Sequence, residues 1–228
     1  MKRVFAEEQM DDPALPPETY RAVLDDLAAV NRLTLAHRPT LRFLAQAMRG
    51  RKRLKLLDVG FGQGDMLRHI AHWAARQGIV AELVGIDLNP GSAAIAEAAT
   101  DPALPIRYLT GDYASLRGEG FDCIVSSLVA HHMSTDELLA FLRFMEAEAR
   151  CGWFVNDIRR SRVAHIGFPI LARVMGWHRI VREDGTLSIA RSFIPADWHQ
   201  VLAQAGIAPQ AARVHPAFPF RLCVTRIY

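Results

Sequence analysis

The feature that most constrains the fold is a glycine-rich turn at the end of a short apolar run. The run is Leu56-Leu57-Asp58-Val59, and it leads directly into Gly60-Phe61-Gly62-Gln63-Gly64. Because glycine lacks a Cβ and tolerates positive φ, such a turn lets the backbone approach a ligand closely. In open α/β sheets, ligands bind at the carboxyl ends of the strands. The turn therefore predicts a nucleotide-type cofactor site.

The spacing of the glycines narrows the class of cofactor. The dinucleotide fingerprint GxGxxG needs its third glycine at position 65, which is Asp65. A Walker loop needs a terminal Gly-Lys-Ser/Thr, and no such triplet follows Gly64. Both phosphate-binding patterns lose support, although an NAD-linked oxidoreductase stays open as an alternative.

The motif Asp58-x-Gly60-x-Gly62-x-Gly64 resembles the first motif of class I S-adenosylmethionine-dependent methyltransferases. The resemblance implies that the loop, with Phe61, wraps the methionine part of the cofactor. It also implies that Asp58 helps to hold the amino group.

Acidic residues at the ends of the next two strands extend the resemblance. It implies that Asp87, followed by Leu88, accepts hydrogen bonds from the two ribose hydroxyls, and that Asp112, followed by Tyr113, accepts from the adenine amine. Ser127, after the fourth strand, completes the predicted cofactor contacts. Each acid alone is equally well explained as a turn or cap residue, but acids at successive strand ends favour one shared site.

Short apolar runs alternate with helical patterns from position 54 onward, which predicts an α/β fold with a mostly parallel, Rossmann-like sheet. Five strands are expected at 54–59, 81–87, 106–111, 121–127 and 153–157, and a final antiparallel pair at 211–217 and 220–227. Helices are expected at 19–31, 39–48 and 194–205, and after Ser134, where Glu137 completes a capping box.

A chain of 228 residues, half of them apolar, can bury the core of a single domain. We expect a helical N-terminal cap or lid (1–50), a cofactor-binding core (51–158), an insertion after the fifth strand (159–192), and a C-terminal helix with strands (193–228). The insertion contains an apolar stretch at 166–177, the best candidate for an acceptor pocket.

A hydroxyl acceptor must lose a proton during methyl transfer, and histidine is the usual base near neutral pH. His131 and His132 follow the fourth strand, where the family places the wall between cofactor and acceptor. Adjacent residues point in different directions, so we expect one of them to act, with His132 ahead of His131. Loop histidines that merely pack are the alternative.

The acceptor contacts predicted around the insertion are Asp157, His165, Phe168, Met175 and Trp177, with His178 as a further candidate base. A dimer face or a core helix would explain the same apolar stretch. The insertion and the segment around Asn31 look similar to bacterial small-molecule methyltransferases of secondary metabolism, associated with polyketide or quinone-like phenols. That similarity implies O-methylation of a small, apolar acceptor.

No metal is expected. Metal-assisted catechol-type enzymes carry carboxylates after the fourth strand and an Asp-Asn pair ending the fifth, whereas this chain has Ser126-Ser127 and Asn156-Asp157. The Asn-Pro-Pro-Tyr segment of exocyclic-amine methyltransferases is also missing after Ser127, which argues against adenine or glutamine as acceptor.

The charge balance favours a small-molecule partner. The net charge is +3, and basic residues are locally dense only at Arg49, Arg51, Lys52, Arg53 and Lys55, so nucleic acid is not expected. A nucleic-acid or protein methyltransferase and a non-catalytic cofactor-binding module remain alternatives. No apolar run suits a signal peptide or a membrane span, which predicts a cytoplasmic protein. We expect a monomer or a homodimer.

The three cysteines, Cys123, Cys151 and Cys223, form no CxxC pair and lie in or beside apolar stretches. We therefore expect buried, reduced thiols rather than a zinc site or a disulfide framework.

Overall fold

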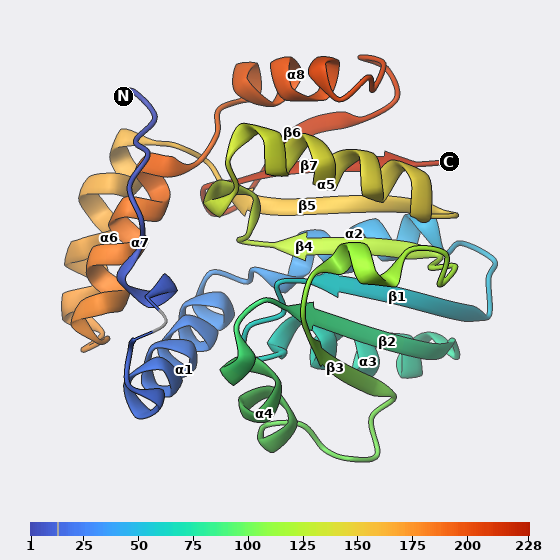
Figure 1. The fold of residues 1–228 in the computed structure, drawn as a ribbon, viewed down its shortest axis with the longest axis horizontal. Coiled ribbons are helices and arrows are strands. Elements are labelled where there is room, and N and C mark those ends of the chain that lie inside the picture. Colours follow the sequence, from blue (N-terminus) through green and yellow to red (C-terminus); the bar gives the residue numbers. More distant parts are fainter. Residues whose placement is uncertain (13) are drawn as a thin grey trace.

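The computed structural model describes residues 1–12 and 14–228, so residue 13 of the predicted cap lies outside the described part. A seven-stranded sheet has the order β3-β2-β1-β4-β5-β7-β6 (Figure 1). Strands β1 to β5 pair in parallel, and β7 runs antiparallel to both β5 and β6. The strands are β1 Arg53–Val59, β2 Val80–Asp87, β3 Ile106–Thr110, β4 Cys123–Ser127, β5 Gly152–Ile158, β6 Arg213–Ala217 and β7 Arg221–Ile227.

Helices cover both faces of this sheet and one of its ends (Figure 1). The α-helices are α1 Pro17–Leu33, α2 His37–Ala47, α3 Asp65–Gln77, α4 Pro90–Ala98, α5 Thr135–Glu148, α6 Arg162–Val174, α7 Arg179–Arg191 and α8 Pro195–Gln204. Short 3-10 turns are η1 Gln9–Asp11, η2 Tyr113–Leu116 and η3 Ala130–His132. The predicted α/β fold, mostly parallel with antiparallel C-terminal strands, is confirmed.

Most predicted boundaries differ from the observed ones by one or two residues. The third strand ends at Thr110 because Gly111 turns, with φ of 141°, and donates its amide to the Asp87 carbonyl at 2.9 Å. The fourth strand begins at Cys123, after Phe121. Around Ser134 the predicted capping box is present: Ser134 Oγ accepts from the Glu137 amide, and the Glu137 carboxylate accepts from the Ser134 amide.

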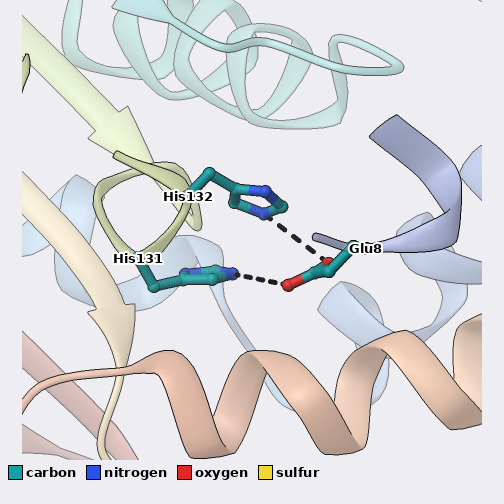
Figure 2. Close-up of side chains that lie close together, drawn as sticks. All are labelled: Glu8, His131 and His132. Carbon is teal, nitrogen blue, oxygen red and sulfur yellow. Dashed lines mark ion pairs between the residues drawn. The ribbon is translucent and has the colours of Figure 1, made fainter. Parts of the chain in front are cut away.

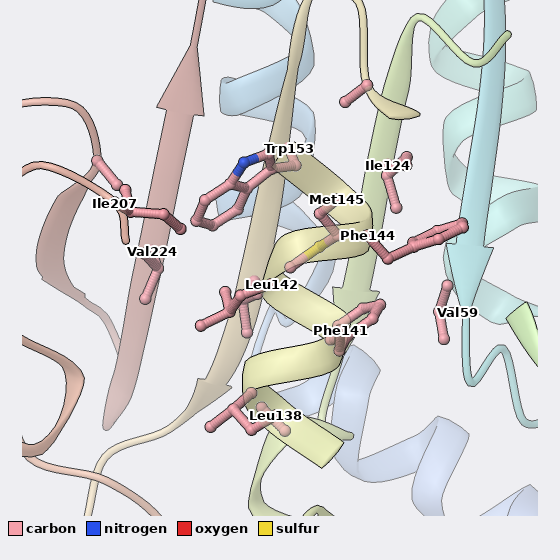
Figure 3. Packing of buried hydrophobic residues seen from close by; sticks show 14 of the residues in the cluster. Val59, Ile124, Leu138, Phe141, Leu142, Phe144, Met145, Trp153, Ile207 and Val224 are labelled. Carbon is pink, nitrogen blue, oxygen red and sulfur yellow. The ribbon is translucent and has the colours of Figure 1, made fainter. Parts of the chain in front are cut away.

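One face of the sheet is covered by α5 and α8. Phe141, Leu142 and Met145 of α5 pack on alternate strand residues such as Ile124 and Trp153 (Figure 3). Strand side chains alternate between faces, so their neighbours in sequence serve the opposite core.

The opposite face is covered by α2, α3 and α4. The ring of Phe43 in α2 stacks on Phe154 of β5, with centroids 5.1 Å apart, and Leu44 is fully buried. Of the predicted N-terminal lid, α2 is therefore a core helix on the sheet. Of this N-terminal segment, α1 and residues 1–12 extend beyond the carboxyl ends of the strands (Figure 1).

The predicted insertion is a pair of contacting helices, α6 and α7, which lies beside α1 at this same end of the sheet (Figure 1). A small apolar cluster joins the three helices through Val23, Ala172 and Val181, together with Trp177 between α6 and α7. The carboxyl ends of β1, β2 and β4 thus face a space bounded by α1, α6 and α7.

The three cysteines are buried and unpaired, as predicted. Within the described residues, no helix combines the length and the apolar character needed to span a membrane.

Candidate functional site

The glycine-rich turn between β1 and α3 is held by its own backbone. Gly60, Gly62 and Gly64 have φ of 76°, 54° and 76°, a conformation that favours glycine. The Gly60 amide donates to the Ile86 carbonyl at 2.8 Å. A Cβ on Gly60 would collide with the side chain of Val129. Glycine is therefore required at Gly60 both by conformation and by space.

Asp58 is buried at the end of β1, with 1% of its surface exposed. Its Oδ1 has no hydrogen-bond partner in the described part of the chain. Burial, followed by the charges of Asp65 and Asp87, raises the pKa of Asp58 to about 8. An unpaired buried carboxylate of this kind calls for a cationic or hydrogen-bond-donating ligand.

Asp87 ends β2 beside the same turn. Its Oδ2 accepts from the Gly62 amide and its Oδ1 from the Asn89 amide, both at 2.9 Å. Burial raises its pKa. The sequence left two alternatives for Asp87, an Asx turn and a contact to the ribose hydroxyls. The two are compatible because each carboxylate oxygen keeps a free lone pair.

The remaining predicted cofactor residues lie around the same opening. Asp112 is exposed, and its Oδ1 caps η2 by accepting from the Ala114 amide at 2.8 Å. Tyr113 packs against two phenylalanine rings of α5. Leu88 is exposed, and Ser127 Oγ is buried without a hydrogen-bond partner in the described residues.

A cavity of about 1500 Å³ opens at this edge of the sheet. All predicted cofactor residues line it except Gly64, which caps the start of α3. Typical ligand pockets enclose roughly 300–1000 Å³, so the cavity has room for a second ligand beside the first. Its other walls come from α1, α6 and α7.

Five side chains bring unpaired polar atoms to this cavity. Each atom is buried and has no hydrogen-bond partner in the described part of the chain, and each residue lines the cavity: Asn31 Oδ1, Asp58 Oδ1, Ser127 Oγ, His131 Nε2 and Arg221 Nη1. Buried polar groups are normally paired, so this concentration marks the cavity as a place for polar ligands.

His131 is anchored by Asp157 on β5. Its Nδ1 lies 2.7 Å from Asp157 Oδ1, and its backbone amide donates to Asp157 Oδ2 at 2.9 Å. Burial alone would raise the pKa of Asp157, but the charge and the hydrogen bond of His131 hold this pKa below its usual range. Since an ionised carboxylate only accepts, Nδ1 carries a proton, and in the neutral form of the ring Nε2 faces the cavity with a free lone pair.

His132 has a different environment. Its Nδ1 lies 3.0 Å from Asp11 Oδ2, its side chain is 25% exposed, and it also lines the cavity. Glu8, from the segment before η1, lies against both histidines. Burial raises the pKa of Glu8 to about 7.

Of the predicted acceptor residues, Phe168 lines the cavity and four others do not. Asp157 is fully buried behind His131. The Nδ1 of His165 lies 3.2 Å from the Thr186 carbonyl, joining α6 to α7. Trp177 is buried in the cluster of α1 and α7, whereas Met175 is half exposed. A helix presents only one face to a cavity, so the apolar stretch could not line it throughout.

Three residues that bring polar atoms to the cavity region were missed as site residues: Glu8, Asn31 and Arg221. Glu8 and Arg221 reach it from opposite ends of the chain. Their spacing in sequence gives no sign of this meeting. Asn31 belongs to the segment singled out by resemblance, but nothing in its spacing predicts its role.

The basic cluster lies at the opposite edge of the sheet. It precedes and begins β1, whereas the cavity opens at the carboxyl end of that strand. The cluster is therefore not part of the candidate site.

Residues 56–150 match a family described as a methyltransferase domain. This segment is a methyltransferase domain. It contains the glycine-rich turn, the three predicted acids and both histidines, whereas Glu8, Asp157 and the pair α6 and α7 lie outside it. A search of curated proteins finds no match.

Solved structures of methyltransferases share the fold of the whole chain. The plantazolicin methyltransferase BpumL with S-adenosylhomocysteine has 13% identity and a TM-score of 0.67, covering 96% of this chain and 94% of that chain. Magnesium protoporphyrin IX methyltransferase from Synechocystis PCC 6803, also with S-adenosylhomocysteine, has 17% identity and a TM-score of 0.57, covering 85% of this chain and 84% of that chain.

Human N-acetylserotonin methyltransferase with S-adenosylmethionine has 13% identity and a TM-score of 0.66, covering 98% of this chain and 60% of that chain. At such identities the similarity shows the fold alone. The family match over residues 56–150 and the shared fold confirm the prediction of a methyltransferase domain with the class I fold.

Proposed function

We propose that the chain transfers a methyl group from S-adenosylmethionine to a hydroxyl oxygen of a small, largely apolar acceptor. The observation that carries the proposal is the buried Nε2 of His131. It has no hydrogen-bond partner among the described residues, is backed by Asp157, and faces the same cavity as the glycine-rich turn.

The residues at the turn fit the proposed cofactor. The unpaired Oδ1 of Asp58 suits its ammonium group, Asp87 has free lone pairs for the two ribose hydroxyls, and exposed Asp112 has one for the adenine amine. A Cβ on Gly60 would collide with Val129, so glycine is needed to keep the turn in this position. When bound, the cofactor supplies an electrophilic methyl group on a sulfonium.

The acceptor half of the cavity is largely apolar. Leu24 and Leu27 of α1 face it together with Phe168 and Leu171 of α6 and Val181 of α7. Such walls exclude water and favour an apolar ring or chain, and they hold the acceptor in line with the methyl group. The solved relatives are named for three different acceptors, so their names support a small molecule without selecting one.

The proposed chemistry uses His131 rather than His132 as the base. Bound S-adenosylmethionine would supply the methyl group to the acceptor oxygen, and Nε2 of His131 would take the proton that this hydroxyl loses. Asp157 then stabilises the resulting imidazolium through Nδ1. His132, partly exposed and paired with Asp11, is less well placed for this step. A cytoplasmic location and a monomeric or homodimeric state remain predictions.

The test is turnover of labelled S-adenosylmethionine with a panel of small phenols, in buffer containing a chelator. His131→Gln should lower kcat by about 100-fold or more, which is within the range that general-base catalysis contributes. The affinity for S-adenosylhomocysteine should not change. His72→Gln, an exposed change on α3, is the matched control. Unchanged kcat in His131→Gln on an accepted phenol would refute the assignment.

A further inference from the structure

Glu8, His131 and His132 form a compact group beside the proposed acceptor site (Figure 2). Nε2 of His131 lies 3.7 Å from Glu8 Oε1, and Nε2 of His132 lies 3.7 Å from Glu8 Oε2. One candidate ligand atom from each residue lies within 4.8 Å of the other two. The 3.7 Å separations are too long for hydrogen bonds. Ligand atoms that share one tetrahedral zinc ion lie roughly 3.4 Å apart, given bonds of about 2.0–2.2 Å.

The far side of each imidazole is fixed by a second carboxylate. Nδ1 of His131 lies 2.7 Å from Asp157, and Nδ1 of His132 lies 3.0 Å from Asp11. Metal-binding histidines almost always donate their other ring N–H to such a partner, which orients the ring and leaves a lone pair for the ion. Both rings of the group share this arrangement, and both free nitrogens point toward the same carboxylate (Figure 2).

The burial of Glu8 and His131 also supports a bound ion. Glu8 and His131 are 4% and 3% exposed, and Nε2 of His131 has no hydrogen-bond partner in the described part of the chain. Glu8 Oε1 accepts from Ser188 Oγ at 2.8 Å and lies 3.6 Å from Arg191 Nη1. The carboxylates of Asp157 and Asp11 hold the far sides of the two imidazoles, and Glu8 lies against both rings.

We propose that Glu8, His131 and His132 bind a divalent transition-metal ion such as Zn²⁺ at the acceptor side of the cavity. Two imidazoles and one carboxylate suit Zn²⁺ and leave a coordination position for a further ligand, whereas Mg²⁺ prefers oxygen ligands. This differs from the expectation of no metal, which rested on the catechol-type positions and could not include Glu8. The ion would also join the N-terminal segment to the methyltransferase domain.

The metal site and the proposed base describe two different states of His131. In the metal-free chain, Nε2 is free to take a proton, and in the metal-bound chain the same lone pair coordinates the ion. Turnover measured with a chelator therefore does not test the metal site. Binding does. Failure to bind zinc would leave the proposed base intact, and failure to bind S-adenosylhomocysteine would leave the metal test intact.

The experiment is calorimetric titration of the chelator-treated, dialysed full chain with ZnCl₂. We expect one ion per chain, at least 100-fold weaker binding in Glu8→Gln and in His132→Gln, and weakening of about 10- to 100-fold in Asp11→Asn. Glu7→Gln, at the exposed neighbouring position, should bind zinc as the unaltered chain does. MgCl₂ should bind much more weakly than ZnCl₂.

A second readout is the thermal midpoint. Zinc should raise the Tm of the unaltered chain and of Glu7→Gln but not that of Glu8→Gln. Titration with S-adenosylhomocysteine shows that each variant is folded. Equal zinc affinity in Glu8→Gln and the unaltered chain, or no zinc binding at high micromolar concentration, would overturn the proposal.

Discussion

Asp58→Asn separates the binding role of the Asp58 carboxylate from any structural role. Asparagine keeps the shape of the side chain and removes its charge. A hydrogen bond to a charged group contributes about 1.5–3 kcal/mol, so affinity for S-adenosylhomocysteine should fall by about 10- to 150-fold. The unpaired Oδ1 of Asp58 has no hydrogen bond to lose in the described residues.

The stability of the ligand-free chain should change in the opposite direction. Burial raises the pKa of Asp58 from 3.8 to about 8, so folding between these pH values requires proton uptake by this group. Stability from the protonated form is full below pH 4 and is lost as pH rises toward 8. Asparagine needs no proton, and at pH 7 it should raise the free energy of unfolding by up to about 4 kcal/mol.

Calorimetric titration with S-adenosylhomocysteine and urea unfolding of the ligand-free chain, both at pH 7, measure the two effects. Asp101→Asn is the control, since that exposed carboxylate accepts only from the Ala103 amide in a turn. Unchanged affinity in Asp58→Asn would refute the reasoning. Loss of stability together with loss of affinity would show that Asp58 is a structural residue instead.

Three further outcomes follow from the structure. Binding of S-adenosylhomocysteine at pH 7 should release about 0.9 proton as Asp58 ionises, because the pKa of Asp58 is about 8. Calorimetric titrations in buffers of different ionisation enthalpy measure the number of protons released. Binding without proton release would contradict the role of Asp58. Gly60→Ala should weaken the binding of S-adenosylhomocysteine at least about 10-fold, because Val129 fills the Cβ position. Gly78→Ala, which is also at positive φ but in open space, should leave this affinity unchanged. Equal affinities of the two variants would argue against the close contact between Gly60 and Val129. Phe141→Ala should lower the free energy of unfolding by about 3–5 kcal/mol in urea, with little effect from Phe218→Ala at the exposed surface, and a loss below 1 kcal/mol would contradict the core assignment.

Local sequence patterns predict the sheet and the turn well. The strands at β1, β2 and β5 are short apolar runs, and α5 begins at the capping box of Ser134, so each signal lies within a few residues of the element it predicts. Helix α7 was not predicted, because polar Asp184 and Ser188 stand among its buried residues. Asp184 is satisfied by the amides of the distant N-terminal segment, which a local pattern does not record.

The catalytic side of the site was harder to predict for the same reason. The pair of His131 and His132 is visible in sequence, but the choice between them depends on Asp157 on the neighbouring strand and on Glu8 from the start of the chain. Asp157 was predicted to contact the acceptor, and the structure places it behind the His131 ring. The difference between the two histidines therefore depends on tertiary contacts that a local sequence pattern does not record.

The central claim is that one cavity holds the methyl donor at the glycine-rich turn and presents Nε2 of His131 to the acceptor. A crystal structure of the chain with S-adenosylhomocysteine tests it most directly. We expect the amino group at Asp58, the ribose at Asp87 and the sulfur facing the part of the cavity that His131 lines. Density for the ligand outside this cavity, or with its sulfur turned away from His131, would contradict it.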